Sequence, residues 1–203
     1  MIFLHTSDWH LGATGGERDL WDDQKYFIDA ICGIVREKRV DAVLLAGDVY
    51  DRSVPAASAI GLYDYAMNRL CGELGVKVLT IAGNHDSAER LASCAGLLDK
   101  AGLYLQGAAQ REPRVVEFAD SQVFFLPWMT EEKIKSLYPE ERDGITDLTE
   151  AYRVAVNHMR EKFIPGKHHL LLSHAFITNA ETSTSDRAAE MGFATQVPAS
   201  VFE

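Results

Sequence analysis

The segment Ala42-Val43-Leu44-Leu45-Ala46-Gly47-Asp48 combines an uninterrupted apolar run with a glycine and a carboxylate directly behind it. Five apolar residues without polar alternation are typical of a strand that is buried on both faces of a sheet. The glycine favours a tight turn, by which the chain can leave the sheet. This segment therefore predicts a buried strand with an acidic side chain at its carboxyl end.

Four further apolar runs have the same character, and they lie at residues 2–6, 76–82, 123–126 and 169–172. Apolar residues recur at helical spacing between these runs: within 22–38 (Phe27, Ile31, Ile34, Val35), after Pro55 (Ile60, Tyr63, Met67, Leu70) and from Leu148 to Phe163. Strands that alternate with helices predict an α/β fold with a largely parallel core sheet. No linker or repeat divides the chain, so we expect one domain over residues 1–203.

The composition excludes several classes of protein. The chain has 203 residues, of which 47% are hydrophobic and 25% are charged, as in ordinary globular proteins. Its 20 Lys and Arg residues against 30 Asp and Glu residues give a net charge of −10, which excludes a general surface for polyanions. No apolar run approaches the roughly 20 residues that a membrane-spanning helix needs. We therefore expect no membrane contact and a cytoplasmic location.

Three cysteines and one histidine have structural rather than catalytic interpretations. Cys32, Cys71 and Cys94 are odd in number and widely spaced, which favours buried, reduced thiols over a disulfide framework. His5 lies inside the first apolar run. We expect it to be buried and hydrogen-bonded rather than to be a metal ligand.

Polar side chains follow four of the predicted strands directly. They occur in Ser7-Asp8-Trp9-His10, Gly47-Asp48-Val49-Tyr50-Asp51, Gly83-Asn84-His85-Asp86 and Ser173-His174. Each motif alone could be an ordinary turn or helix cap. Because the carboxyl ends of parallel strands meet at one edge of a sheet, the four motifs together predict a functional site there.

The chemistry of this set favours a catalytic metal site. It offers carboxylates, an amide and imidazoles but no thiolate, which suits Mn²⁺, Fe²⁺ or Zn²⁺ at a catalytic site better than a structural zinc cage. Asp8 and His10 lie two residues apart, so on an extended backbone they could share one ion. Asp48 falls between the other ligand groups in the chain and is the natural bridge between two ions. Asn84 could add a carbonyl oxygen and His174 a nitrogen.

These motifs resemble those of the calcineurin-like metallophosphoesterases, whose fold is a four-layer α/β sandwich of two mixed β-sheets flanked by helices. The longer stretches Thr6-Ser7-Asp8-Trp9-His10-Leu11-Gly12 and Val197-Pro198-Ala199-Ser200-Val201-Phe202 resemble the SbcD type of DNA nuclease subunit. The resemblance runs from residue 2 to residue 202. It implies a metal-dependent DNA exonuclease and endonuclease of an SbcCD-type complex that processes DNA ends and hairpins in repair and recombination. It also implies an SbcC-like SMC-family ATPase as partner and a homodimer.

The resemblance also implies a role for each residue of the site. Asp8 and His10 would bind a first metal ion, Asn84 and His174 a second, and Asp48 would bridge the two, with Mn²⁺ as the expected metal. His85 would lie above the metals and act on the scissile phosphate. Asp86 would orient the imidazole ring of His85.

One family motif, Gly-His-x-His, does not occur in the sequence, and no histidine follows His174. We therefore expect an incomplete nuclease core, without two ligands, the DNA-facing cap or the SbcC-binding region, that binds Mn²⁺ weakly and cleaves little DNA alone. Two alternatives stay open. A small-molecule or protein phosphatase of the same superfamily would use the same ligands, and a non-catalytic scaffold fragment would bind metal poorly.

Overall fold

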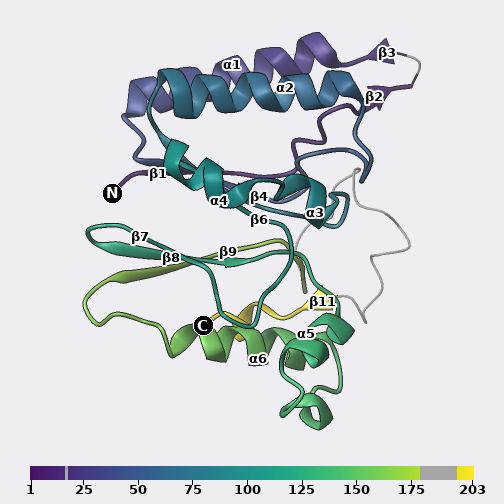
Figure 1. Cartoon of the computed structure of the whole chain (residues 1–203), viewed down its shortest axis with the longest axis vertical. Helices are drawn as coiled ribbons and strands as arrows, with labels where there is room; N and C mark the ends of the chain where they lie inside the picture. The colour runs from purple at the N-terminus through teal and green to yellow at the C-terminus, as the bar shows by residue number, and fades with distance from the viewer. Residues whose placement is uncertain (17, 179–195) are drawn as a thin grey trace. The chain divides into compact units, whose positions relative to one another are not determined.

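The computed structural model describes residues 1–16, 18–178 and 196–203 (Figure 1). The chain divides into two compact units. The first comprises Met1–Ala108, Phe125–Pro127 and Leu172–His174, and the second comprises Ala109–Phe124, Trp128–Leu171 and Ala175–Glu203.

A parallel sheet of four strands forms the centre of the first unit. Its order is β1 (Phe3–Thr6), β4 (Ala42–Ala46), β5 (Lys77–Ile81) and β6 (Leu103–Gln106), and all neighbours are parallel. Every residue of β4 is buried. The structure thus confirms the buried parallel strand that the sequence around Gly47 predicts. The expected burial of His5 is wrong, because β1 lies at the edge of the sheet and His5 is exposed.

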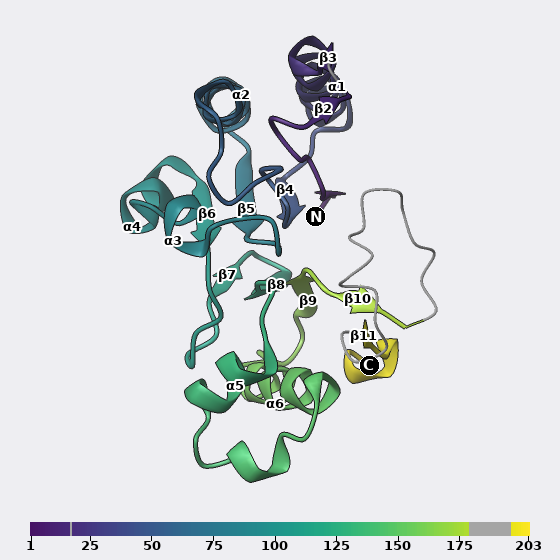
Figure 2. The same ribbon diagram turned by 90° about the vertical axis from the view of Figure 1, so that its right-hand side faces the viewer.

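Two long helices, α1 (Trp21–Lys38) and α2 (Ala57–Met67), lie side by side on one face of this sheet (Figures 1 and 2). The face that α1 buries is rotated from the predicted stripe: Ile28, Ile31, Cys32 and Val35 are buried, whereas Phe27 and Ile34 are exposed. The remaining elements of this unit are the hairpin β2 (Thr14–Gly15) and β3 (Arg18–Asp19), the π-helical η1 (Asn68–Glu73), α3 (Ala88–Leu91), α4 (Ala95–Leu98) and η2 (Asp99–Ala101).

The second unit contains a different arrangement of strands and helices. Strand β7 (Val115–Glu117) pairs antiparallel with β8 (Ser121–Leu126), and β9 (His168–Ser173) follows in the same sheet. Helices α5 (Glu131–Leu137) and α6 (Leu148–Arg160) pack against each other (Figure 2). Short elements complete the unit: η3 (Arg142–Gly144), β10 (Phe176–Ile177), β11 (Gln196–Val197) and η5 (Ala199–Val201). The chain is therefore mixed α/β with several sheets, as predicted.

The three cysteines are free thiols, as expected, but they differ in burial: Cys32 is buried, Cys71 is half-buried and Cys94 is exposed. The expected burial is therefore wrong for Cys94, which lies beside the short helix α4 at a left-handed backbone position. Among the described residues, no helix combines the length and the apolar character needed to cross a membrane.

Candidate metal centre

The residues that the sequence predicts as ligands come together in the first unit. Strand β1 leads into Asp8 and His10, β4 into Asp48, and β5 into Asn84, while His174 follows β9. The carboxyl ends of β1, β4 and β5 meet because these strands are parallel neighbours in one sheet.

The two loops after β1 and β4 are joined through their backbones. The Asp8 amide donates to the Gly47 carbonyl (3.1 Å), and the His10 amide donates to the Asp48 carbonyl (3.0 Å). Asp8, His10 and Asp48 all have positive φ angles, of 55°, 41° and 51°. Residues with a Cβ rarely adopt this conformation. The hydrogen bonds between the loops therefore hold three side chains in positions that local preference alone would not give.

The carboxylate of Asp48 is the centre of the site and is only 3% exposed. Its Oδ1 accepts a hydrogen bond from the His85 amide (2.9 Å). Its Oδ2 lies 3.8 Å from Nε2 of His10, 3.5 Å from Nε2 of His174 and 3.9 Å from Nε2 of His85. Burial opposes ionisation of this carboxyl, but the hydrogen bond with His174 and the other nearby groups prevail and lower its pKa. The carboxylate is thus ionised and surrounded by imidazoles.

Two glycines make room for this arrangement. A Cβ on Gly83 would lie 2.1 Å from Oδ1 of Asp48, and a Cβ on Gly47 would lie 2.6 Å from Nδ1 of His174. Gly47 also has a φ of 88°, which glycine adopts without strain. The glycine in each motif is therefore required by the close approach of a site side chain.

His174 shows most clearly that the site suits a cation. Its Nδ1 lies 2.7 Å from the Ala46 carbonyl, so this nitrogen carries a hydrogen and donates. Its Nε2 faces two oxygens, Oδ1 of Asn84 at 3.0 Å and Oδ2 of Asp48 at 3.5 Å. A neutral ring would present a lone pair to both. Burial lowers the pKa of His174, but the hydrogen bond and the charge of Asp48 outweigh it and raise the pKa. A proton or a metal ion between these atoms would remove the repulsion between their lone pairs. The donor set therefore fits a divalent cation.

A second set of donors lies beside the first. Oδ1 of Asp8 is 3.7 Å from Nε2 of His10, and Asp8, His10 and Asp48 each offer a ligand atom within 4.8 Å of the others. The interaction with Asp8 raises the pKa of His10. Ser7 donates a hydrogen bond to Asp8 and holds its carboxylate in place. These three residues fit one divalent ion.

His85 and Asp86 are each held by hydrogen bonds to the backbone. Nδ1 of His85 lies 2.9 Å from the backbone carbonyl of Asp51 and donates to it. The carboxylate of Asp86 accepts hydrogen bonds from the backbone amides of Val49 (3.1 Å), Tyr50 (2.9 Å) and Gly83 (2.9 Å). Asp51 therefore orients the ring of His85, and Asp86 ties together the loops after β4 and β5. Burial raises the pKa of Asp86, although these amide bonds oppose the shift.

Comparison with known proteins agrees with this geometry. The sequence matches the calcineurin-like phosphoesterase family over residues 1–193. The chain belongs to the calcineurin-like phosphoesterase family. Within that family it is similar to the SbcD subunit of nuclease SbcCD from Staphylococcus epidermidis (strain ATCC 12228 / FDA PCI 1200), with 29% identity over 192 residues. The match covers 95% of this chain and 51% of the relative, so the chain spans about half the length of the curated relative it matches.

Phosphoesterases of this family are hydrolases that bind divalent metals, and this phosphoesterase has clustered His and Asp side chains that could hold them. The structure brings all predicted ligands into one group of neighbours: Asp8, His10, Asp48, Asn84 and His174. The sequence interpretation missed Asp51 as a member of the site. The second Asp of Gly-Asp-x-x-Asp was the available signal, because it repeats the residue type of the first.

Proposed function

We propose that this phosphoesterase is a metal-dependent DNA phosphodiesterase, the nuclease subunit of an SbcCD-type complex. The observation that carries the proposal is the convergence of imidazoles from three strand ends on the buried carboxylate of Asp48. The similarity to the SbcD subunit of a nuclease, over 95% of this chain, supports DNA as the substrate.

In this proposal Asp8 and His10 would hold one divalent ion and Asn84 and His174 a second, with Asp48 as a ligand to each. Mn²⁺ is the expected metal. Oxygen-rich donor sets with some imidazole suit Mn²⁺. Ions bound there would polarise the phosphoryl oxygens and lower the pKa of bound water.

His85 is the proposed acid that assists the leaving oxygen. Its Nδ1 is engaged by the Asp51 carbonyl, so Nε2 is the nitrogen on the Asp48 side of the ring. When protonated, Nε2 can donate to an oxygen that leaves phosphorus. Asp86 supports this step through the backbone, because it fixes the loops that carry Asp48 and His85.

The remaining proposals concern the assembly and depend on the nuclease similarity. We infer that residues 1–203 act as one nuclease core, that the protein works as a homodimer with an SbcC-like SMC-family ATPase on DNA, and that it does so in the cytoplasm. The name of the relative supports the complex, since that protein is a subunit of SbcCD.

A comparison of three substrates tests the activity. The chain would be incubated with saturating Mn²⁺, which offsets weak ion binding by mass action, and with a bis-aryl phosphodiester, an aryl phosphomonoester or linear duplex DNA. We expect turnover of the diester, and slow cleavage of DNA, above the level of the Asp48→Asn variant. Turnover of the monoester alone would favour a phosphatase, and no turnover by folded, metal-loaded protein would favour a scaffold.

A further inference from the structure

The loops around the candidate metal centre carry one cationic side chain that the proposed mechanism does not use. These loops, residues 7–13, 47–56 and 82–87, contain four carboxylates, and Arg52 is their only Lys or Arg. An acidic surface repels a substrate with several phosphates unless metal ions or local cations compensate for it. Arg52 is therefore the side chain of these loops that can attract a phosphate directly.

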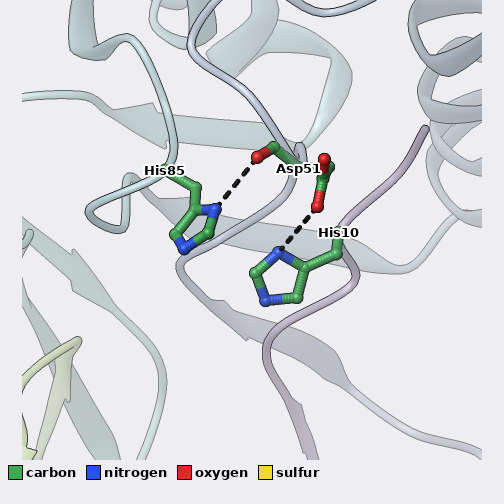
Figure 3. A group of neighbouring side chains, drawn as sticks. All are labelled: His10, Asp51 and His85. Atoms are coloured by element: carbon green, nitrogen blue, oxygen red, sulfur yellow. Dashed lines mark hydrogen bonds and ion pairs between the residues drawn. The ribbon is translucent and has the colours of Figure 1, made fainter. Parts of the chain in front are cut away.

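Arg52 lies next to the residue that orients His85. Figure 3 shows Asp51 beside two imidazoles: its carbonyl oxygen is 2.9 Å from Nδ1 of His85, and Oδ1 of its carboxylate is 3.9 Å from Nδ1 of His10. The other carboxylate oxygen, Oδ2, accepts a hydrogen bond from Nε of Arg52 at 3.3 Å. One carboxylate group thus separates the guanidinium from the His10 ring, and Arg52 lies at the rim of the metal centre.

The guanidinium of Arg52 is exposed and weakly bound. Its side chain is 77% exposed, and its contact with Asp51, at 3.3 Å, is longer than the 2.7–2.9 Å or so of a strong charge-assisted hydrogen bond. Exposed ion pairs of this kind contribute little to stability. A phosphate offers a guanidinium the same bidentate geometry as a carboxylate does. It can therefore replace Asp51 as the partner of Arg52.

The backbone around Arg52 is anchored on both sides. Nη1 of Arg90, in α3, donates a hydrogen bond to the Ser53 carbonyl at 3.0 Å. The Asp51 amide donates to the Leu11 carbonyl at 3.2 Å. These bonds tie the loop after β4 to α3 and to the loop after β1. The Arg52 backbone therefore has a fixed position beside the metal centre, which limits the phosphate positions that its side chain can reach.

We propose that Arg52 binds the phosphate next to the scissile one in a DNA strand, so that the site favours a polynucleotide over an isolated phosphodiester. Successive phosphates of one strand are separated by about 3.4 Å along the helix axis. A metal centre and an arginine at its rim can therefore bind two phosphates in succession. This role rests on the proposed function and names the feature of the substrate, a second phosphate, that the site recognises.

A comparison of thymidine dinucleotides tests this role. They carry a terminal phosphate at one end, at the other end or at neither, and cleavage of the internal diester at saturating Mn²⁺ is followed by chromatography. In the wild type, kcat/KM for one of the two phosphorylated dinucleotides should be about 10-fold above that of the unphosphorylated one, the effect of a hydrogen bond between charged groups. In Arg52→Gln this preference should disappear. Because the preference is a ratio within one protein, a general loss of activity or folding does not change it.

Arg36→Gln is the matched control. It removes the same charge from the last turn of α1, where Arg36 is exposed, and it should keep the wild-type preference. An equal preference in Arg52→Gln and wild type would overturn the proposal. Equal cleavage of all three dinucleotides by the wild type would overturn it as well.

A binding measurement makes the test independent of turnover. NMR of the arginine Nε–H groups, with diamagnetic Mg²⁺ in place of Mn²⁺, should show a larger shift of the Arg52 signal with a phosphorylated dinucleotide than with the unphosphorylated one. An Arg52 signal that does not distinguish them would contradict the proposal. Absence of turnover on the bis-aryl phosphodiester would refute the proposed function and leave this binding result unaffected.

Discussion

His85 is the residue at which metal binding and chemistry can be separated. It is not one of the proposed Mn²⁺ ligands, so His85→Ala should leave Mn²⁺ affinity close to that of the wild type. Turnover of a phosphodiester should fall by about 10²–10⁴, the usual contribution of a positioned acid or base. Steady-state kinetics and Mn²⁺ titration of the same preparation check both points. Loss of Mn²⁺ in proportion to activity would make His85 a ligand instead.

Asp48 should behave differently, because one carboxylate is proposed to contact both ions. Asp48→Asn removes that charge, and we expect Mn²⁺ affinity to fall by at least about 10–100-fold and turnover to be lost. Asp64→Asn, on the exposed side of α2, is the control and should change neither. Two tightly bound Mn²⁺ ions with normal turnover in Asp48→Asn would refute the bridge.

Gly83, next to the site, and Gly33, in helix α1, should respond in opposite ways to replacement by alanine. A Cβ on Gly83 would collide with Oδ1 and the backbone nitrogen of Asp48, at 2.1 and 2.4 Å, whereas a Cβ on Gly33 of α1 would meet nothing within 4 Å. Gly83→Ala should therefore lower the free energy of unfolding by about 1–3 kcal/mol. Gly33→Ala should raise it by about 0.5–1 kcal/mol. Urea denaturation measures both, and equal stability of the two variants would contradict the close approach of Asp48 to Gly83.

Most residues of the site could be predicted from the sequence, because residues that follow neighbouring parallel strands lie at the same edge of the sheet. The backbone hydrogen bonds of Asp51 and Asp86 could not. Asp86 contacts Val49 and Tyr50, which are 37 and 36 positions away, and Asp51 presents its backbone rather than its side chain to His85. Such contacts depend on the exact course of two loops, which no local pattern encodes.

Between helices, a polar network ties α1 to α2 and η1. Asp29 of α1 accepts hydrogen bonds from Lys25 (2.9 Å), Tyr65 (2.6 Å) and Arg69 (2.8 Å). Lys25 and then Tyr65 are the main causes of the lowered pKa of Asp29. Since the pKa in the folded state is below the value in the unfolded state, this carboxylate stabilises the fold above the unfolded pKa. That contribution is lost as the pH falls through the folded pKa.

Asp29→Asn should accordingly lower the melting temperature at pH 7. The difference from the wild type should shrink once the pH falls below 3.8, the ordinary pKa of the group. Thermal unfolding at a series of pH values measures this, with Asp64→Asn as a control that should show no such pH dependence. A difference that is constant from pH 7 to pH 3 would show that the charge of Asp29 is not responsible.

The elements themselves were predicted to different degrees. The strand at 42–46 agrees in both bounds, since a run buried on all sides has a sharp boundary at Gly47. The extent of helix α1 was predicted, but not the face that it buries. Phe27 packs against Trp9, with ring centroids 5.7 Å apart, and stays partly exposed. Helix α6 is capped by Asp147, whose side chain accepts a hydrogen bond from the Glu150 amide. The sequence interpretation did not include strand β6.

For the molecule as a whole, the net charge limits the affinity for DNA. With a net charge of −10, the metal-free chain should bind duplex DNA no more tightly than about 10⁻⁴ M at physiological salt, the weak end of non-specific binding. Mn²⁺ should strengthen binding, because it neutralises the carboxylates of the site. Fluorescence anisotropy with labelled DNA measures both. Sub-micromolar affinity of the metal-free chain would show that local Lys and Arg residues outweigh the overall charge.

The left-handed backbone at Asp8, His10 and Asp48 has an evolutionary consequence. Each of these residues adopts a conformation that costs roughly 1 kcal/mol or more and that glycine adopts freely. Replacement by glycine would relieve that strain while removing a ligand. Selection for folding alone and selection for metal binding therefore oppose each other at these three positions. In a gene copy that is no longer used for catalysis, selection for folding alone would favour glycine at these positions. Such glycines would indicate that activity was lost while the fold was kept.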